Sequence, residues 1–229
     1  MRTLGIFAKH PVAGTVKTRL AAETDASFAT DLYTAFLSDL TARLRDLADE
    51  RVIGFAPNAD SAREYFTALA DSQYQLWVQP DGGLGERISA FLDFAQRGVA
   101  DRVVLIGSDS PTLPRSYLEK AFAALESNDV VIGPATDGGY YLIGLAKAPG
   151  AIFDEIEWSG SSVLNQTVTA IARQGDSLAV LDPWYDVDTL EDVHALWGHL
   201  QAWKLGGLEP CPQTFELLER HRDAAIIGK

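Results

Sequence analysis

The 229-residue chain contains one cysteine, Cys211, so no disulfide can form within it. Such scarcity is typical of proteins from a reducing compartment, and we expect a cytoplasmic location. No apolar run approaches the roughly 20 residues that a membrane-spanning helix needs, and the N-terminal apolar run is too short for a secretion signal. The sequence therefore predicts neither a disulfide-stabilised secreted domain nor a membrane protein.

Positive charge is scarce as well. The chain has 19 Lys and Arg against 32 Asp and Glu, which gives a formal net charge of -13. Binding of nucleic acid or of an anionic membrane surface depends on a broad basic face, so we expect neither as a partner. A small phosphorylated ligand is compatible with this charge, because a local cationic field can oppose the global one.

Hydrophobic residues make up 47% of the chain, and their spacing predicts alternating strands and helices. This alternation predicts a three-layer α/β/α fold with a mostly parallel central sheet. The turn Asp137-Gly138-Gly139 leaves no room for a helix between its flanking strands, so these two are not expected to be parallel neighbours. The predicted strands are 4–8, 52–56, 75–78, 102–106, 129–132, 140–145 and 178–181, and the predicted helices are 27–47, 61–70, 84–96, 114–125, 161–173 and 190–203.

The sequence predicts one domain over residues 1–204 and a C-terminal extension over residues 205–229. Gly206-Gly207 breaks the chain before a polar tail, and no change of composition marks an earlier linker. Tryptophans on the last predicted helix permit a homodimer without requiring one. Lone Cys211 lies between two prolines in the tail and carries no sign of catalytic activation.

Most of the local positive charge lies in one loop, residues 9–20, directly after the first strand. Lys9, Lys17 and Arg19 could converge there on anionic oxygens, with Gly14 permitting a turn. Val16 stands where a Walker A sequence requires glycine, and the loop is no G-x-G-x-x-G turn, so P-loop enzymes and dinucleotide folds are disfavoured. The alternative interpretation is a solvated basic loop.

Carboxylates follow two later strands. Asp109 comes directly after the buried strand 102–106, and Asp186 and Asp188 alternate after strand 178–181. Mg²⁺ is commonly held by one or two carboxylates together with phosphate oxygens. As alternatives, Asp109 stabilises a turn, and Asp188 forms a capping box with Glu191 at the start of the last helix.

Two glycine-rich segments could approach a ligand closely. Residues 82–87 open the helix 84–96 and could offer backbone amides, together with Arg87, to a base or phosphate. The second is the turn Asp137-Gly138-Gly139 that precedes Tyr140, where adjacent glycines permit close backbone approach. The alternative interpretations are a flexible loop and a tight structural turn.

Taken together, these segments resemble the radical-SAM/selenodomain-associated transferase family, type 1. The resemblance is collinear over roughly residues 3–197, and its most specific parts are Lys17-Thr18-Arg19-Leu20 and the Gly133–Tyr140 segment. Ser110 stands where that family often has cysteine, and Ile88 where it often has methionine. The motifs that carry the resemblance are Lys9-x-Pro11-x-x-Gly14-x-Val16-Lys17-Thr18-Arg19-Leu20, Gly83-x-Gly85-x-Arg87, Gly107-Ser108-Asp109-x-Pro111, Gly133-Pro134-Ala135-x-Asp137-Gly138-Gly139-Tyr140, Trp158-Ser159 and Asp186-Val187-Asp188-Thr189.

That family is similar to nucleotide-diphospho-sugar transferases and, in outline, to 2-phospholactate and molybdenum cofactor guanylyltransferases. The resemblance implies a mixed central sheet of the GT-A type and a Mg²⁺ (or Mn²⁺) cofactor. It implies catalytic roles for Lys17, Arg19 and Asp109. It also implies nucleotide binding by Lys9, Gly14, Lys17, Thr18, Arg19, Gly85, Arg87 and Asp109, substrate binding by Asp137, Gly138, Gly139, Tyr140 and Trp158, and metal binding by Asp109, Asp186 and Asp188.

The sequence thus favours an enzyme that transfers a nucleotidyl group from a nucleoside triphosphate to a small phosphorylated or anionic acceptor. A glycosyltransferase with a nucleotide-sugar donor is the first alternative, because the same fold serves both reactions. A non-catalytic nucleotide-binding module is the second. Pyrophosphate release, nucleoside diphosphate release, or binding without turnover would distinguish the three.

Overall fold

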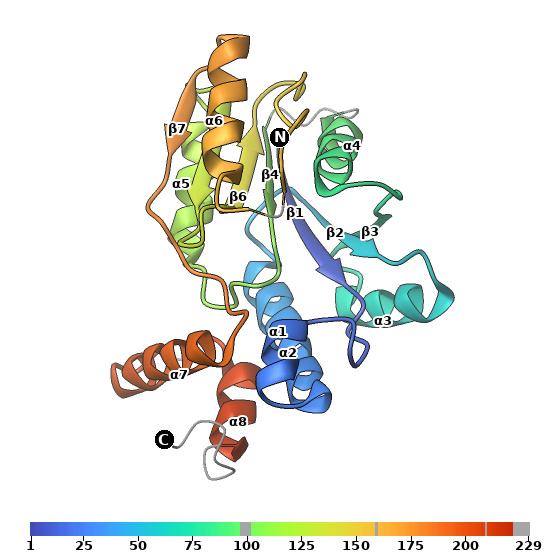
Figure 1. Ribbon diagram of the computed structural model, residues 1–229, viewed down its shortest axis with the longest axis vertical. Helices are drawn as coiled ribbons and strands as arrows, with labels where there is room; N and C mark the ends of the chain where they lie inside the picture. Colours follow the sequence, from blue (N-terminus) through green and yellow to red (C-terminus); the bar gives the residue numbers. More distant parts are fainter. Residues whose placement is uncertain (97–101, 159, 209, 222–229) are drawn as a thin grey trace. The chain divides into compact units, whose positions relative to one another are not determined.

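The computed structural model describes residues 1–96, 102–158, 160–208 and 210–221, so Ser159 of the Trp158-Ser159 motif lies outside the described residues. Strands and helices alternate along most of this part of the chain (Figure 1). The strands are β1 (Arg2–Lys9), β2 (Glu50–Ala56), β3 (Gln75–Val78), β4 (Arg102–Ile106), β5 (Val130–Pro134), β6 (Tyr140–Leu145) and β7 (Leu178–Val180). The helices are α1 (Thr18–Glu23), α2 (Ala26–Leu44), α3 (Asp60–Ala70), α4 (Leu84–Gln96), α5 (Arg115–Ala124), α6 (Val163–Gln174), α7 (Leu190–Leu205) and α8 (Pro212–His221).

The chain forms two compact units, each built from segments that are separate in sequence. The first, here the sheet unit, comprises Met1–Ala8, Arg45–Gly107 and Leu113–Tyr185. The second, here the helical unit, comprises Lys9–Leu44, Ser108–Thr112 and Asp186–Lys229. The predicted division into residues 1–204 and 205–229 stays a prediction.

The sheet has the strand order β3-β2-β1-β4-β6-β5-β7. The pairs β1–β4, β2–β3 and β5–β7 are parallel, whereas β6 runs antiparallel to both of its neighbours, β4 and β5. The prediction of a mixed α/β sheet is therefore confirmed, and the reversal falls at the strand for which the sequence left no crossover helix. Parallel strands need such a crossover, whereas β5 and β6 are joined by a short turn.

Helices cover both faces of this sheet. On one face Phe91 of α4 and Ile171 of α6 join a buried cluster with Val103 and Leu105 of β4. On the other face Phe66 of α3 packs against Phe55 of β2, with the ring centroids 5.1 Å apart. Helix α5 packs against β4 and β5. Successive residues of a strand point to opposite faces, so the fully apolar β4 supplies both layers.

Two helices were not predicted. The short α1 (Thr18–Glu23) begins within the predicted loop 9–20 and continues three residues beyond it. The expectation of a polar tail after Gly206-Gly207 is wrong over Pro212–His221, which form α8. Phe215, Leu217 and Leu218 of α8 are buried, and α8 packs on α2 within the helical unit. Most polar residues of α8 are exposed on its opposite face. Because they outnumber the apolar residues, the segment was interpreted as a polar tail.

The first turn of α8 is capped by a side chain from α2. Asp39 is 2% exposed, and its carboxylate accepts hydrogen bonds from the Gln213 amide at 3.1 Å, the Thr214 amide at 2.8 Å and the Thr214 hydroxyl at 2.6 Å. Burial raises the pKa of Asp39, and these hydrogen bonds oppose that rise. A helix leaves its first amides without partners, so a residue distant in sequence here does the work of a local cap.

We expect Cys211 to resist thiol reagents in the folded protein. Its side chain is fully buried, its thiol donates to the Pro111 carbonyl at 3.1 Å, and burial raises its pKa to about 12. Only the thiolate is nucleophilic, so at pH 8 the native thiol should react with Ellman's reagent at least about 100-fold more slowly than in guanidinium chloride. The unfolded chain should release one equivalent, and a full equivalent released within seconds from native protein would contradict this burial.

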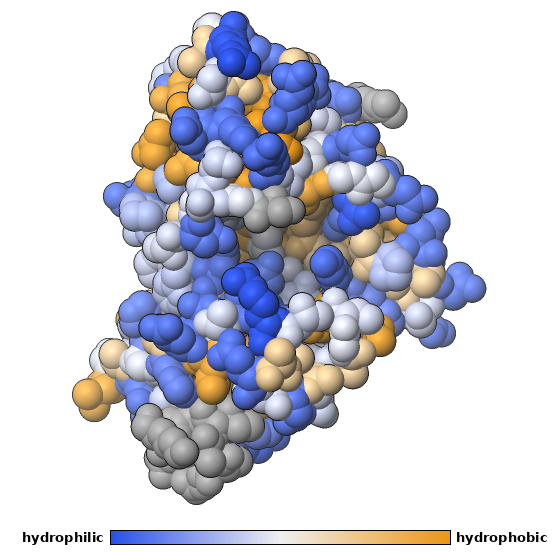
Figure 2. All heavy atoms as spheres, in the orientation of Figure 1, coloured by the Kyte–Doolittle hydropathy of each residue, from blue (hydrophilic) through white to orange (hydrophobic). Residues whose placement is uncertain are grey.

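Polar side chains dominate the visible face of the molecule, and apolar ones gather in smaller groups (Figure 2). Large apolar side chains that are exposed in the described part of the chain include Val12, Leu84, Val180, Leu205 and Leu208. None of the helices in the described ranges combines the length and the apolar character that crossing a membrane requires.

Candidate functional site

The cationic loop turns sharply before its lysine. Gly14 has φ +80°, and the Thr15 amide and hydroxyl both donate to the Val12 carbonyl, at 3.0 and 2.8 Å. Val16 is 4% exposed and anchors the loop in the helical unit. Lys17 follows with φ 47° and ψ 44°, a left-handed conformation that is unfavourable for a residue with a Cβ. The unfavourable backbone conformation thus falls at a residue for which the resemblance predicts a catalytic role.

The Lys17 ammonium lies between two carboxylates. It forms ion pairs with Asp109 and with Asp188, the latter at 3.0 Å, and the Lys17 side chain is 3% exposed. The rings of Tyr33 and Phe36 each lie with their centroids 5.7 Å from Nζ. All of these residues belong to the helical unit. The solvated basic loop considered as an alternative does not describe Lys17.

Burial alone would lower the pKa of Lys17, because the charged form loses its hydration. Asp109 and Asp188 outweigh that effect by charge and hydrogen bonding, and the pKa of Lys17 rises above its ordinary value. Lys17 therefore carries a full positive charge at any physiological pH. A buried cation of this kind depends on its carboxylate partners, because removing them would leave an uncompensated charge.

Asp109 and Asp188 are brought together although 79 residues separate them in sequence. The Val187 amide donates to the Asp109 carbonyl at 2.9 Å, which joins the two backbone segments directly. Asp188 also pairs with Arg19, whose side chain is 67% exposed. The Asp109 side chain is 46% exposed, so one face of this charged group is open to a ligand.

Asp186 is oriented differently from its two neighbours. Its carboxylate accepts a hydrogen bond from the Ser110 hydroxyl. Burial raises the pKa of Asp186 to about 6, the Ser110 hydrogen bond opposes that rise, and the nearby charges of Asp109 and Asp188 add to it. The predicted metal-binding role of Asp186 stays a prediction, but its observed contact is to Ser110.

The expectation that Asp188 caps the last helix is wrong by one residue. Thr189 is the N-cap of α7, and it forms a capping box with Asp192. The Asp192 carboxylate also accepts from the Asp188 amide at 3.0 Å. Since Thr189 takes the capping role, the Asp188 carboxylate is left for Lys17 and Arg19.

Sequence reasoning missed Tyr33, and it assigned no role to Ser108, although Ser108 belongs to one of the motifs. The Tyr33 hydroxyl accepts from the Lys9 amide at 3.0 Å and is hydrogen-bonded to the Ser108 hydroxyl at 2.7 Å. It therefore ties the start of the cationic loop to the residue that precedes Asp109. The available signal was the position of Tyr33 beside the apolar stripe of α2. A tyrosine hydroxyl that is buried there needs a hydrogen-bond partner.

The carboxylates suit a divalent cation in part. Among the described residues, no group of three or more His, Cys, Asp or Glu side chains is arranged to hold a metal. Asp109 and Asp188 nevertheless share one cation, the Lys17 ammonium. Two carboxylates that already bind a positive charge, one of them half exposed, fit Mg²⁺ that arrives with phosphate oxygens rather than a cage made by the protein alone.

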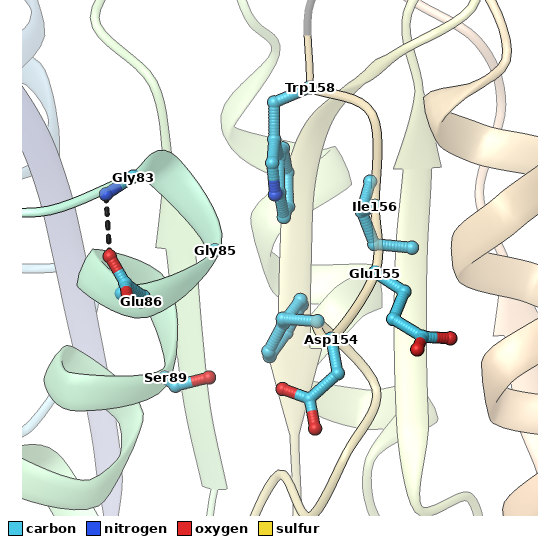
Figure 3. A pocket seen from close by; sticks show the side chains of 9 residues that line it. Gly83, Gly85, Glu86, Ser89, Asp154, Glu155, Ile156 and Trp158 are labelled. Atoms are coloured by element: carbon cyan, nitrogen blue, oxygen red, sulfur yellow. Dashed lines mark hydrogen bonds between the residues drawn. The ribbon is translucent and has the colours of Figure 1, made fainter.

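The sheet unit holds a separate pocket of about 540 Å³. Figure 3 shows the first turns of α4 on one side of it and Asp154, Ile156 and Trp158 on the other. The described residues that line it include no basic side chain, so a phosphate group would gain no counter-charge there. Its lining consists of Gly83, Gly85, Glu86, Ser89, Phe153, Asp154, Glu155, Ile156 and Trp158.

Two motif residues meet at this pocket. A Cβ on Gly85 would lie 2.8 Å from the Trp158 indole nitrogen and 2.9 Å from the Phe153 carbonyl oxygen, so glycine is required there for close packing. The ring of Tyr140 lies at 6.2 Å from that of Trp158, edge to face. Nearby on α4, the buried Arg87 Nε has no hydrogen-bond partner among the described residues.

The Asp137-Gly138-Gly139 segment has the contacts of a structural turn. The Gly139 amide donates to the Asp137 carboxylate at 2.9 Å, and the Leu164 amide donates to the Gly138 carbonyl at 3.0 Å. Gly138 has φ +95°, which favours glycine. The predicted substrate residues, together with Gly85 and Arg87, lie in the sheet unit, whereas the other predicted nucleotide and metal residues lie in the helical unit.

Comparison with known proteins assigns a family. Residues 37–160 match the model of a family described as an uncharacterized protein conserved in bacteria (DUF2064). The chain belongs to this family. A search of curated proteins finds no match.

Solved structures place the DUF2064 chain among transferase folds. It is 34% identical to a candidate nucleotide-diphospho-sugar transferase from Desulfovibrio desulfuricans, over 98% of this chain and 96% of that one, with a TM-score of 0.89. A cytidylyltransferase from Leptospira borgpetersenii matches with a TM-score of 0.58 at 13% identity, over 99% and 96% of the two chains. A nucleotidyl transferase from Methanothermobacter matches with a TM-score of 0.59 at 14% identity, over 87% and 97%.

The predicted fold class is confirmed by these matches, and the predicted transferase class agrees with the names that these proteins carry. The two matches below 25% identity support the fold alone.

Proposed function

We propose that this DUF2064 protein is a nucleotidyltransferase that uses a nucleoside triphosphate with Mg²⁺ or Mn²⁺. The observation that carries the proposal is the Lys17 ammonium held between Asp109 and Asp188, with Arg19 beside it. Such a group offers cations to phosphate oxygens and carboxylates to a metal at one place. Phosphoryl-centred reactions are catalysed mainly by that combination of positioning and charge.

In the proposed reaction an oxygen of the acceptor attacks the α-phosphorus, the bond to the β-phosphate oxygen breaks, and pyrophosphate leaves. Lys17 and Arg19 would neutralise charge on the phosphates, Arg19 through its guanidinium fork. Asp109 and Asp188 would hold the divalent cation, which when bound would offset negative charge as it develops on the phosphate oxygens. These residue roles, the cofactor and a small anionic acceptor are parts of the proposal.

A glycosyltransferase with a nucleotide-sugar donor is the second candidate. The 34% identical relative carries the name of a nucleotide-diphospho-sugar transferase, which favours it. In that reaction the sugar–phosphate bond breaks and a nucleoside diphosphate leaves, so the same charges would stabilise a different leaving group. The association with radical-SAM and selenium proteins, the homodimer and the cytoplasmic location also stay predictions.

A nucleotide screen tests the proposal. Nucleoside triphosphates and nucleotide sugars are each added with and without Mg²⁺, and the melting temperature is recorded. A true ligand at about 100 times its Kd should raise the melting temperature by about 5–10 °C, and only with the metal present. With an acceptor added, phosphorus NMR should then detect pyrophosphate.

Nucleoside diphosphate as the product would instead support the glycosyltransferase. Binding that is never followed by turnover would support a non-catalytic module. The absence of a metal-dependent shift with any nucleotide would overturn the proposed function.

A further inference from the structure

Asp109 and Asp188, the carboxylates proposed to hold the metal, are already paired with the protein's own cation. The Lys17 ammonium pairs with both carboxylates, at 3.0 Å from Asp188, and its side chain is almost completely buried. Arg19 pairs with Asp188 as well. These four residues carry two negative and two positive charges, so their ion pairs are balanced, and the adjacent Asp186 carboxylate instead accepts a hydrogen bond from Ser110.

Lys17 is held there by more than its charge. The rings of Tyr33 and Phe36 lie 5.7 Å from Nζ and close the group on the side of α2. A lysine above an aromatic ring gains from the negative face of the ring, most of all where water is excluded. The left-handed backbone at Lys17 fixes where the side chain starts.

A free divalent cation would meet strong opposition at this group. It would have to displace the ammonium or share the carboxylates with it, and two like charges within about 4 Å repel strongly even at intermediate dielectric. Mg²⁺ also loses its hydration shell reluctantly, and carboxylates that are already paired with Lys17 and Arg19 attract it only weakly. A polyphosphate changes this balance, because its oxygens give Lys17 and Arg19 new partners and add ligands for the metal.

We propose that Lys17 closes this site to free divalent cations, so that its ligand is the preformed complex of metal and nucleoside triphosphate. The inference rests on the proposed function and makes it more specific. The ammonium transfers from Asp109 and Asp188 to phosphate oxygens when the complex enters, and the two carboxylates then face the metal. Metal binding is therefore coupled to nucleotide binding through one side chain.

Mn²⁺ binding to the full chain without nucleotide tests this inference. Titration calorimetry, with electron paramagnetic resonance of free Mn²⁺ as a second readout, is applied to the wild type and to Lys17→Met. The wild type should bind Mn²⁺ weakly or not at all, and Lys17→Met should bind it about tenfold more tightly or better. Lys120→Met, which removes the same charge from the surface of the sheet unit, should behave as the wild type does.

Two further variants keep the test decisive. Lys17→Asn also removes the charge and tolerates the left-handed backbone, so it serves if Lys17→Met does not fold. Asp109→Asn added to either variant should abolish the gained affinity. The inference is overturned if the wild type binds Mn²⁺ alone as tightly as the Lys17 variants do, or if the gain survives Asp109→Asn.

Failure of this inference and failure of the proposed function give different results. Tight Mn²⁺ binding by the wild type together with a metal-dependent nucleotide shift removes the inference and leaves the function. Gain of Mn²⁺ affinity in Lys17→Met without any nucleotide shift in the wild type removes the function, and it leaves Lys17 as the residue that excludes the metal.

Discussion

Replacing Asp109 by asparagine is expected to lower the rate of transfer by about two to three orders of magnitude, the loss typical for removal of one preorganised electrostatic group from an active site. The substitution preserves shape and removes one charge from the group around Lys17. Asp109 follows the last residue of β4 by three positions in sequence, and its side chain is 46% exposed, so its charge is accessible rather than buried in the core. We expect the loss in kcat rather than in folding.

The same variant should remain folded. Lys17 keeps Asp188 at 3.0 Å, and the backbone bond from the Val187 amide to the Asp109 carbonyl does not involve the side chain. Asp93→Asn on the exposed surface of α4 is the matched control, and it should keep wild-type turnover. Steady-state rates and melting temperatures of both variants decide the matter: turnover within a few-fold of wild type in Asp109→Asn would exclude Asp109 as a necessary ligand.

The sheet was predictable because its signals are local. The apolar run of β4 and the short turn between β5 and β6 each determine structure locally, and both predictions are confirmed by the observed pairings. Helix α8 was missed because its stability comes from distant partners. Its first amides bind Asp39 of α2, and no pattern within 212–221 announces that partner.

The candidate site shows the same division. The sequence pointed to Lys17, Asp109 and Asp188, and the structure brings these three into contact. The sequence did not indicate that Lys17 would be buried against the carboxylates. The burial of Lys17 depends on Tyr33 and Phe36 of α2, which are distant in sequence from Asp109 and Asp188. The alternating positions of Asp186 and Asp188 suggest equal roles. In the structure, however, Asp186 accepts a hydrogen bond from the Ser110 hydroxyl, whereas Asp188 pairs with Lys17.

Asp39→Ala is expected to lower the free energy of unfolding by about 3 kcal/mol. The carboxylate accepts three hydrogen bonds at the start of α8, and bonds to a charged group are worth roughly 1.5–3 kcal/mol each, with partial compensation when water replaces them. Asp31→Ala removes the same charge from an exposed position on the same helix, so it should change stability by less than about 0.5 kcal/mol. Urea denaturation of the two variants and the wild type measures both values.

Hydrogen exchange separates local from global loss in this variant. If Asp39 acts as the cap of α8, the amides of Gln213 and Thr214 lose protection in Asp39→Ala well beyond the amides of β4, because α8 then opens before the sheet does. Asp39→Asn keeps one acceptor oxygen and loses the charge, so it should fall between the wild type and Asp39→Ala. Uniform loss of protection in all elements would mean that α8 has no separate opening and that the cap stabilises the whole cooperative fold. A decrease in the free energy of unfolding of less than about 1 kcal/mol in Asp39→Ala would contradict the capping role, because the loss of three hydrogen bonds to a buried carboxylate should cost more than that.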